Sequence, residues 1–119
     1  MDGLVVKNYD EGITPQDVVI TNNTGRNLGV SNVKRVGNVC YFHLFFNSAN
    51  SAISGTLVTF PFKANGRADF VAYYADSNNA NMGVQLCYMI DNTATLVLAD
   101  NIVQANNFLA VSGCFVCKD

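Results

Sequence analysis

The sequence is poor in charge and in side chains that perform catalysis. Of its 119 residues, 13% are charged, one is histidine and none is tryptophan. The formal net charge is −2 and no cluster of Lys and Arg is present, which argues against nucleic-acid binding, because tracking phosphates requires several spaced positive groups. No apolar run approaches the ~20 residues of a membrane helix. The first residues also lack the basic segment and apolar core of a signal peptide.

Candidate catalytic residues are few and scattered. His43 stands inside an apolar run, where a histidine is typically packed rather than catalytic, and Glu11 is the only glutamate. The aspartates of the regular part fall at expected strand ends or turns. No serine has the Gly-x-Ser-x-Gly context of a nucleophile, and no glycine-rich phosphate loop is present. The sequence therefore predicts a protein that is not an enzyme and has no cofactor and no metal site.

Short apolar runs separated by turns rich in Gly and Asn are abundant instead. Half of the residues are hydrophobic, and a chain of this length fits one domain that buries roughly two thirds of its unfolded surface. The runs, rich in β-branched and aromatic residues, span residues 39–46, 56–60, 69–74, 84–90, 95–98 and 108–116. Regular runs of strand length predict an all-β fold, an antiparallel β-sandwich of jelly-roll-like type, over residues 1–119.

Residues 1–35 are less regular than the rest. Short strands are predicted at residues 4–6, 18–20 and 30–36, with turns at residues 10–15 and 22–27. Two interpretations remain open, since this segment either completes the sandwich or forms a neck that leads into it. Residues 99–107 have room for one helical turn.

The run 39–46 is apolar on both of its faces. Alternation in an extended strand puts Tyr41, His43 and Phe45 on one face. The other face holds Cys40, Phe42, Leu44 and Phe46. A strand of a solvated sheet alternates apolar with polar residues, so here one face enters the core and the second needs another cover. We expect Tyr41, His43 and Phe45 to lie in a subunit interface of a homo-oligomer.

The run 82–90 also has one continuous apolar face. This face consists of Met82, Val84, Leu86, Tyr88 and Ile90. The opposite face consists of Gly83, Gln85, Cys87 and Met89. Residues 91–94 are predicted to be the tip of a hairpin that leads into the run 95–98.

The four cysteines favour free structural thiols. Cys40 and Cys87 lie inside apolar runs, where cysteine acts as a small hydrophobe. Cys114 and Cys117 are three residues apart, so in an extended strand they point to opposite faces and cannot bridge or share a metal. A single disulfide and a zinc site are the alternatives to this interpretation.

The best binding candidate is the polar loop that follows the run 69–74. Sugars are held by aromatic faces together with planar amides and carboxylates, and this loop offers that combination at a strand end. The candidate ligand-binding residues are Tyr73, Tyr74, Asp76, Asn78, Asn79 and Asn81. The alternative is a polar hairpin loop with tyrosine packed at its base. One such site binds weakly, so repetition in an oligomer would raise the affinity through avidity.

Three segments between residues 33 and 117 carry landmarks of a known family. Residues 33–39 (VKRVGNV) contain Gly-Asn followed by Val, residues 54–61 (SGTLVTFP) a glycine followed by a strand that ends in Phe-Pro, and residues 109–116 (LAVSGCFV) a closing strand. This pattern resembles the C-terminal head domains of tailed-phage tail, fibre and baseplate proteins. The chain departs from that pattern at residues 62–67 (FKANGR), where the family often has a Gly-Tyr-Arg-Pro-like segment, and at residues 91–94 (DNTA).

The resemblance implies a β-sandwich head, commonly trimeric, that recognises a host cell-surface saccharide or cell-wall polymer without enzymatic activity. It also implies a location in the virion, in the tail or fibre, after synthesis in the host cytoplasm. The alternative function is a structural β-sandwich module of a virion or secreted complex that has no ligand of its own. A glycan array would separate the two functions.

Overall fold

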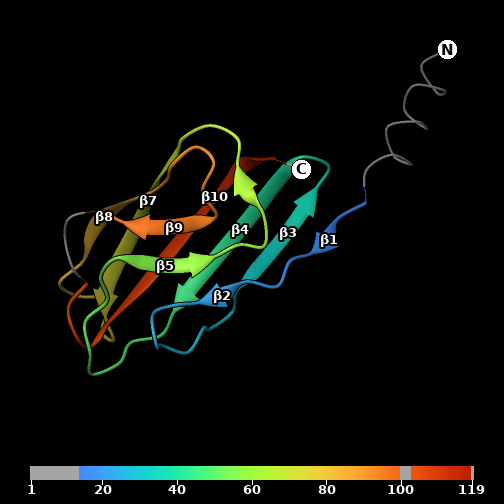
Figure 1. The fold of residues 1–119 in the computed structure, drawn as a ribbon. Helices are drawn as coiled ribbons and strands as arrows, with labels where there is room; N and C mark the ends of the chain where they lie inside the picture. Colours follow the sequence, from blue (N-terminus) through green and yellow to red (C-terminus); the bar gives the residue numbers. More distant parts are fainter. Residues whose placement is uncertain (1–13, 100–102, 119) are drawn as a thin grey trace, which may run out of the picture.

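The computed structural model describes residues 14–99 and 103–118. These residues form an all-β fold, in which an antiparallel sheet curls into a half-barrel, so the prediction of an antiparallel, jelly-roll-like β-sandwich is confirmed (Figure 1). The described residues contain no helix, and hence none that is long and apolar enough to traverse a lipid bilayer.

Ten strands pair in one curled sheet. They are β1 (Gln16–Asp17), β2 (Thr21–Asn22), β3 (Asn32–Val36), β4 (Val39–Phe46), β5 (Thr56–Thr59), β6 (Lys63–Ala64), β7 (Ala68–Asp76), β8 (Gly83–Met89), β9 (Thr95–Leu98) and β10 (Asn107–Lys118). The order across the sheet is β1-β3-β4-β10-β7-β8-β9-β5-β2, and β6 pairs with β10. In Figure 1, β5 and β9 cross over the long strands β4 and β10, which gives the fold its two layers.

β10 lies inside the sheet, between β4 and β7. Its 12 residues pair with β4 along one side, from Leu109↔Phe46 to Val116↔Val39. They pair with β7 and β6 along the other side. β10 carries Gly113 on its inner face, where a Cβ would lie 2.4 Å from the ring of Phe70. Glycine at this position therefore leaves the space that the Phe70 ring occupies.

An aromatic cluster fills the middle of the core between the two layers. The ring centroid of Phe42 from β4 lies 5.0 Å from that of Phe70, edge to face, and 5.8 Å from that of Phe60. Phe115 from β10 contacts Phe60 edge to face at 4.9 Å. Edge-to-face arrangements at these centroid distances are the favoured geometry for aromatic pairs. The cluster is joined by buried aliphatic residues of the second layer, which include Leu57, Leu96 and Leu98.

One end of the half-barrel is closed by loops. Leu28 forms an isolated bridge with Phe46 at the end of β4, and Ile53 forms another with Val103. The amide of Asn106 donates to the carbonyl of Ala49 at 2.6 Å. The segment after β2, the segment after β4 and the segment before β10 therefore meet at this end.

Arg26 ties these three segments together from inside the protein. It is 3% exposed, and burial lowers the pKa of its guanidinium. Its Nη1 donates to the carbonyl oxygen of Asn107 and, at 3.3 Å, to that of Asn47. Its Nη2 donates to the carbonyl oxygens of Ser51 and Gln104. The buried cation thus supplies donors to backbone carbonyls after β4 and around the start of β10.

The turn that carries Arg26 is held by its own polar side chains. The Oδ1 atom of Asn22 accepts hydrogen bonds from the amide and the hydroxyl of Thr24, and Asn22 Nδ2 donates to the carbonyl of Arg26 at 2.6 Å. Gly25 has a φ of +75°, which glycine adopts without strain. The turn predicted at residues 22–27 is confirmed.

Several sequence predictions need correction at the short elements. Residues 18–20 are not a strand. They connect β1, which pairs with β3, to β2, which pairs with β5. The described part of residues 99–107 contains a bridge at Val103 and a turn but no helix. The hairpin tip at 91–94 is confirmed, with Asn92 at a φ of 64°. The predicted strand at residues 4–6 lies outside the described residues, as do part of residues 10–15 and part of the segment considered as a neck.

All four cysteines are free thiols, which confirms the prediction from the sequence. Cys117 is buried and Cys114 is exposed, so the two point to opposite faces of β10. Burial raises the pKa of Cys40 and of Cys87 to about 12, and burial also raises the pKa of Cys117.

These environments predict selective thiol chemistry. At pH 8 the thiolate of a cysteine with a pKa of about 12 amounts to about one molecule in ten thousand, and only the thiolate is nucleophilic. We expect a thiol-specific chromogenic reagent to label Cys114 quickly in the folded protein and all four cysteines after unfolding. The Cys114→Ser variant should lose the fast phase. A fast phase that survives this substitution would contradict the assignment.

Candidate functional site on the outer face of the sheet

The outer face of the sheet carries the three residues of β4 that the sequence analysis expects in a subunit interface. Tyr41 and His43 are exposed and Phe45 is half-buried, whereas the alternate residues of β4 are buried in the core. The predicted division of this strand into a core face and an outer face is therefore confirmed. Whether a second subunit covers the outer face remains a prediction.

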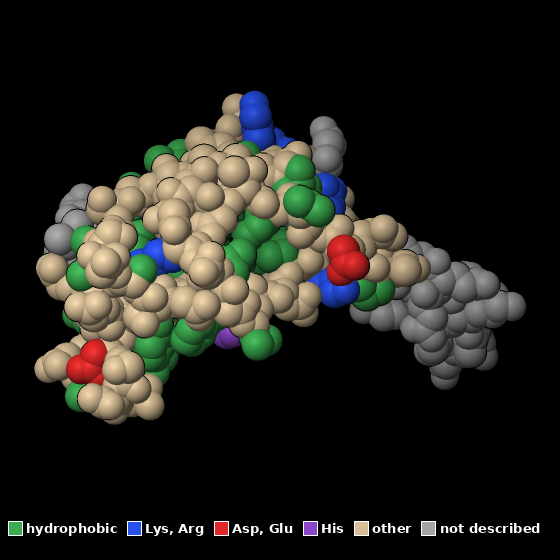
Figure 2. Space-filling view, turned by 90° about the horizontal axis from the view of Figure 1, so that it is seen from below, with side chains coloured by type: hydrophobic (Ala, Val, Ile, Leu, Met, Phe, Trp, Pro, Cys, Tyr) green, Lys and Arg blue, Asp and Glu red, His purple; other side chains and the backbone are tan. Residues whose placement is uncertain are grey.

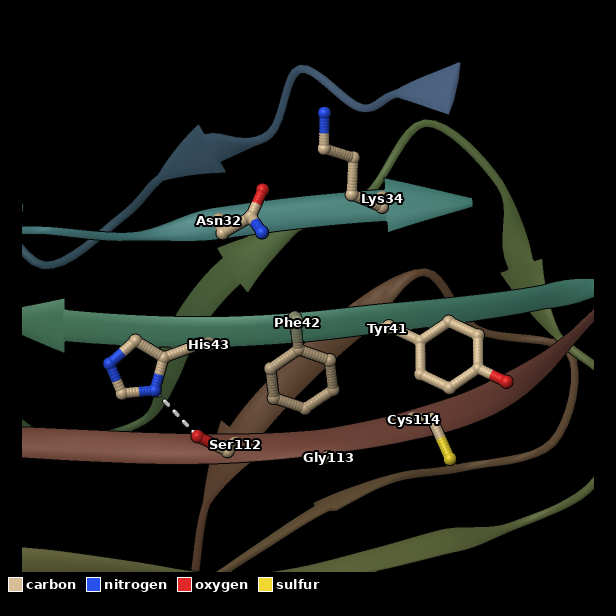
Figure 3. Close-up of a pocket in the computed structure, with 8 residues that line it drawn as sticks. All are labelled: Asn32, Lys34, Tyr41, Phe42, His43, Ser112, Gly113 and Cys114. Carbon is tan, nitrogen blue, oxygen red and sulfur yellow. Dashed lines mark hydrogen bonds between the residues drawn. The ribbon is translucent and has the colours of Figure 1, made fainter. Parts of the chain in front are cut away.

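A hollow of about 410 Å³ lies on this face over β3, β4 and β10. Its lining consists of Asn32, Lys34, Tyr41, Phe42, His43, Ser112, Gly113 and Cys114. Figure 3 shows the ring of Tyr41 next to Cys114 at one end and His43 next to Ser112 at the other. The hollow thus combines an aromatic ring with an amide, an imidazole, a hydroxyl and an amine.

Strand register determines which side chains meet in the hollow. Asn32 pairs with His43 and Lys34 pairs with Tyr41 across β3 and β4. His43 in turn pairs with Ser112 across β4 and β10. Since cross-strand partners on one face have Cβ atoms about 5 Å apart, the strand register makes these side chains neighbours. Lys34 also forms an ion pair with Asp17 of β1.

His43 and Ser112 form a hydrogen bond of 2.6 Å between Nδ1 and Oγ. A serine nucleophile requires, besides a histidine, a group that orients the histidine and donors that receive the oxyanion. Within residues 14–99 and 103–118, Ser112 is the only side chain that hydrogen-bonds to His43. Both side chains are exposed to solvent. The pair is thus open to solvent on the floor of the hollow.

A second hollow of about 390 Å³ adjoins the first and shares His43. Its other lining residues are Gly29, Val30, Phe45 and Asn47. Phe45 stacks on Phe108 of β10 with ring centroids 4.9 Å apart. Phe108 also contacts Tyr73 of β7 edge to face at 5.4 Å. The outer face therefore carries its own aromatic cluster, the outer aromatic cluster, which consists of Phe45, Phe108 and Tyr73.

Beyond the outer aromatic cluster, the outer face is occupied by exposed apolar side chains of β7, β8 and their flanks. This apolar patch consists of Val71, Tyr73, Met82, Val84, Leu86 and Ile90. In Figure 2, hydrophobic side chains gather along the lower rim on both sides of the purple side chain of the only histidine. The structure buries Gln85, Cys87 and Met89 instead, so the apolar face predicted for residues 82–90 is the outer one.

The polar loop after β7 is closed on itself through Asp76. The Oδ1 atom of Asp76 accepts hydrogen bonds from the amides of Asn78 and Ala80, and Oδ2 accepts one from Nδ2 of Asn81. These bonds, led by that from Ala80, lower the pKa of the Asp76 carboxyl. The bonds stabilise the fold fully at pH values above the ordinary range of a carboxyl, and are lost as pH falls through the lowered pKa. Asn79 adopts a left-handed φ of 56°.

The two tyrosines of the predicted ligand site lie on opposite faces of β7. Tyr73 is 39% exposed on the outer face, where it contacts Phe108. Tyr74 packs against the core and lies over Gly83 of β8, where a Cβ would be 2.3 Å from its hydroxyl oxygen. The structure thus brings Asp76 into contact with Asn78 and Asn81, and it separates the two aromatic rings from each other.

Three polar residues of the first hollow, Asn32, Lys34 and Ser112, were not predicted from the sequence. Asn32 and Lys34 could have been found by counting back from the Gly37-Asn38 turn, because this turn pairs Val36 with Val39 and fixes the hairpin register. Ser112 has no local signal, since its partner His43 is 69 residues away. Among the residues that the structure describes, no group of three His, Cys, Asp or Glu side chains is placed to hold a metal ion.

Comparisons with known proteins find no relative. No protein-family model matches the chain, and no similar curated protein or solved structure is found.

Proposed function

We propose that this protein is a non-enzymatic attachment domain that binds a host cell-surface saccharide, as a head of a phage tail or fibre would. The observation that carries the proposal is the first hollow, where an exposed tyrosine ring lies beside polar groups on a rigid sheet. A concave surface with a few convergent polar groups is the usual form of a small-ligand site.

The chemistry of the hollow suits a sugar ring. The face of Tyr41 offers a surface for the C–H groups of a pyranose, and it is 51% exposed. Asn32 and the bonded pair of His43 and Ser112 offer donors and acceptors for hydroxyl groups. Lys34, whose charge is balanced by its ion pair with Asp17, adds further hydrogen-bond donors.

The loop after β7 supplies a second, smaller contact in this proposal. The oxygens of Asp76 are engaged by the loop itself, so hydroxyl groups of a ligand would meet the amides of Asn78 and Asn79. A preorganised loop loses little conformational entropy on binding. Because each contact is weak, attachment to a cell surface would depend on several copies acting together.

The proposal predicts that Tyr41 dominates binding to saccharide. On an array of bacterial surface and cell-wall polysaccharides, the wild-type protein should bind a subset, and Tyr41→Ala should lower the affinity about tenfold or more, which corresponds to about 1.4 kcal/mol. The melting temperature should stay the same, because Tyr41 is on the outer face. Tyr88→Ala is the matched control, since Tyr88 lies on the same face of the sheet, on β8.

Two outcomes would contradict this site assignment. An array that stays blank for the wild-type protein would reject saccharide binding and favour the alternative of an assembly module without a ligand. Unchanged binding by Tyr41→Ala, together with loss of binding by the double variant Tyr74→Ala and Asn79→Ala, would move the site to the loop after β7.

A further inference from the structure

The apolar patch is the largest feature of the outer face that the proposed saccharide site does not use. Val71 pairs with Leu86 and Tyr73 pairs with Val84, so these side chains form two adjacent cross-strand pairs. Val71, Val84 and Leu86 are 61%, 67% and 60% exposed. Large apolar side chains are exposed singly on most surfaces, but a contiguous group of them marks an interaction site.

The patch continues into the outer aromatic cluster of Phe45, Phe108 and Tyr73. Phe45, Ala110, Tyr73 and Val84 are aligned in one row across β4, β10, β7 and β8. At about 4.8 Å between strands and about 3.3 Å per residue, β7 and β8 over about eight residues each, with about four residues each of β4 and β10 next to Phe45, present roughly 400 Å² of flat surface before side-chain relief is added. This area is below the roughly 600–1,000 Å² that each partner buries in a standard stable interface, so we expect a weak, concentration-dependent contact.

We propose that a second copy of this chain covers the apolar patch. The six side chains of the patch are uncharged. Asp76 lies beyond the Met82 end, and Asp69, which faces the same side next to Tyr88, is neutralised by its ion pair with Arg67. A symmetric contact places the same surface against itself, so an uncharged patch meets no repulsion there. Interfaces between identical subunits are also more apolar than those with transient foreign partners, which are about as polar as the rest of the surface.

The geometry allows the two copies to meet as stacked sheets. Aligned sheets pack about 10 Å apart, and Val and Leu side chains on both inner faces fill that space. The interface is centred on β7 and β8, whereas the first hollow lies over β3, β4 and β10 at the Tyr41 end of the sheet. A dimer would therefore present two hollows, one from each copy. Of the residues that the sequence predicts for an interface, Phe45 lies at the margin of this contact.

Light scattering coupled to size exclusion tests the proposal. We expect the wild-type mass to rise from 12.9 kDa toward twice that value between about 5 and 200 µM, because an interface of this size gives affinities near the micromolar range. Leu86→Lys should stay at the monomer mass throughout. Val19→Lys is the matched control, since Val19 is 86% exposed and lies outside the patch, and it should associate like the wild type.

Two further measurements protect the test against a variant that fails to fold. The wild-type melting temperature should rise with protein concentration, as it does when association stabilises the folded state. Val84→Thr keeps the shape of the side chain and should weaken association by a few-fold with an unchanged circular dichroism spectrum. A wild-type protein that keeps its monomer mass at about 200 µM, or a dimer that persists in Leu86→Lys, would overturn the proposal.

Discussion

Replacing Arg26 with methionine should lower the free energy of unfolding by about 2–4 kcal/mol and the melting temperature by on the order of 10 °C. Methionine fills much of the same volume but donates no hydrogen bond. The carbonyl oxygens of Asn107 and Ser51 would then remain near the core without their donors. Each buried carbonyl that loses its partner costs about 1–3 kcal/mol. Urea unfolding followed by circular dichroism measures the loss.

Arg26→Lys is the informative companion to this substitution. Lysine keeps the charge, but its single ammonium cannot reach the carbonyls of both other segments, as the planar fork of a guanidinium does. We expect an intermediate loss of stability. If Arg26→Met unfolds at the same urea concentration as the wild-type protein, water satisfies the loop carbonyls and Arg26 does not hold this end of the half-barrel closed.

Phe42→Ala should cost about 3–5 kcal/mol, the largest loss expected from a single truncation in this core. Phe42 is 4% exposed and contacts the rings of Phe60, Phe70 and Phe115. Removing the ring takes away its burial and leaves a cavity between the two layers of the sheet. Calorimetry or urea unfolding should show a large drop in stability, or a chain that no longer folds at 37 °C.

Phe45→Ala is the matched control, because it removes the same side chain from the same strand three residues away. Phe45 is half-buried on the outer face, where it stacks on Phe108. Its truncation should cost about 1 kcal/mol, since exposed aromatic pairs contribute about 0.5–1.5 kcal/mol beyond burial. Equal losses for the two substitutions would mean that the outer face is as well packed as the core, and the assignment of faces would be wrong.

Alternation of side chains predicted the long strands well. The run 39–46 coincides with β4 and the run 95–98 with β9. Period-two burial is a local property that a strand keeps wherever it pairs, and turns rich in Gly and Asn mark its ends. The same alternation correctly separated Cys114 from Cys117, since it depends only on the strand being extended.

Elements that depend on distant partners were beyond the sequence. β1, β2 and β6 have two residues each, too few to show a period. Arg26 looked like an ordinary turn residue, because its acceptors come from segments that folding brings together. Alternation divided residues 82–90 into two faces but could not choose between them, and the pairing with β7 turned the more apolar face outward.

The position of β10 between β4 and β7 has a consequence during translation. The strands from β3 to β9 are synthesised before residues 107–118, yet β4 and β7 have their shared neighbour only in that last strand. While the ribosome still holds these residues, the emerging polypeptide has two half-sheets with open edges. Unpaired edges of this kind are prone to misassembly. Until β10 emerges and pairs with both, β4 and β7 therefore each keep an open edge.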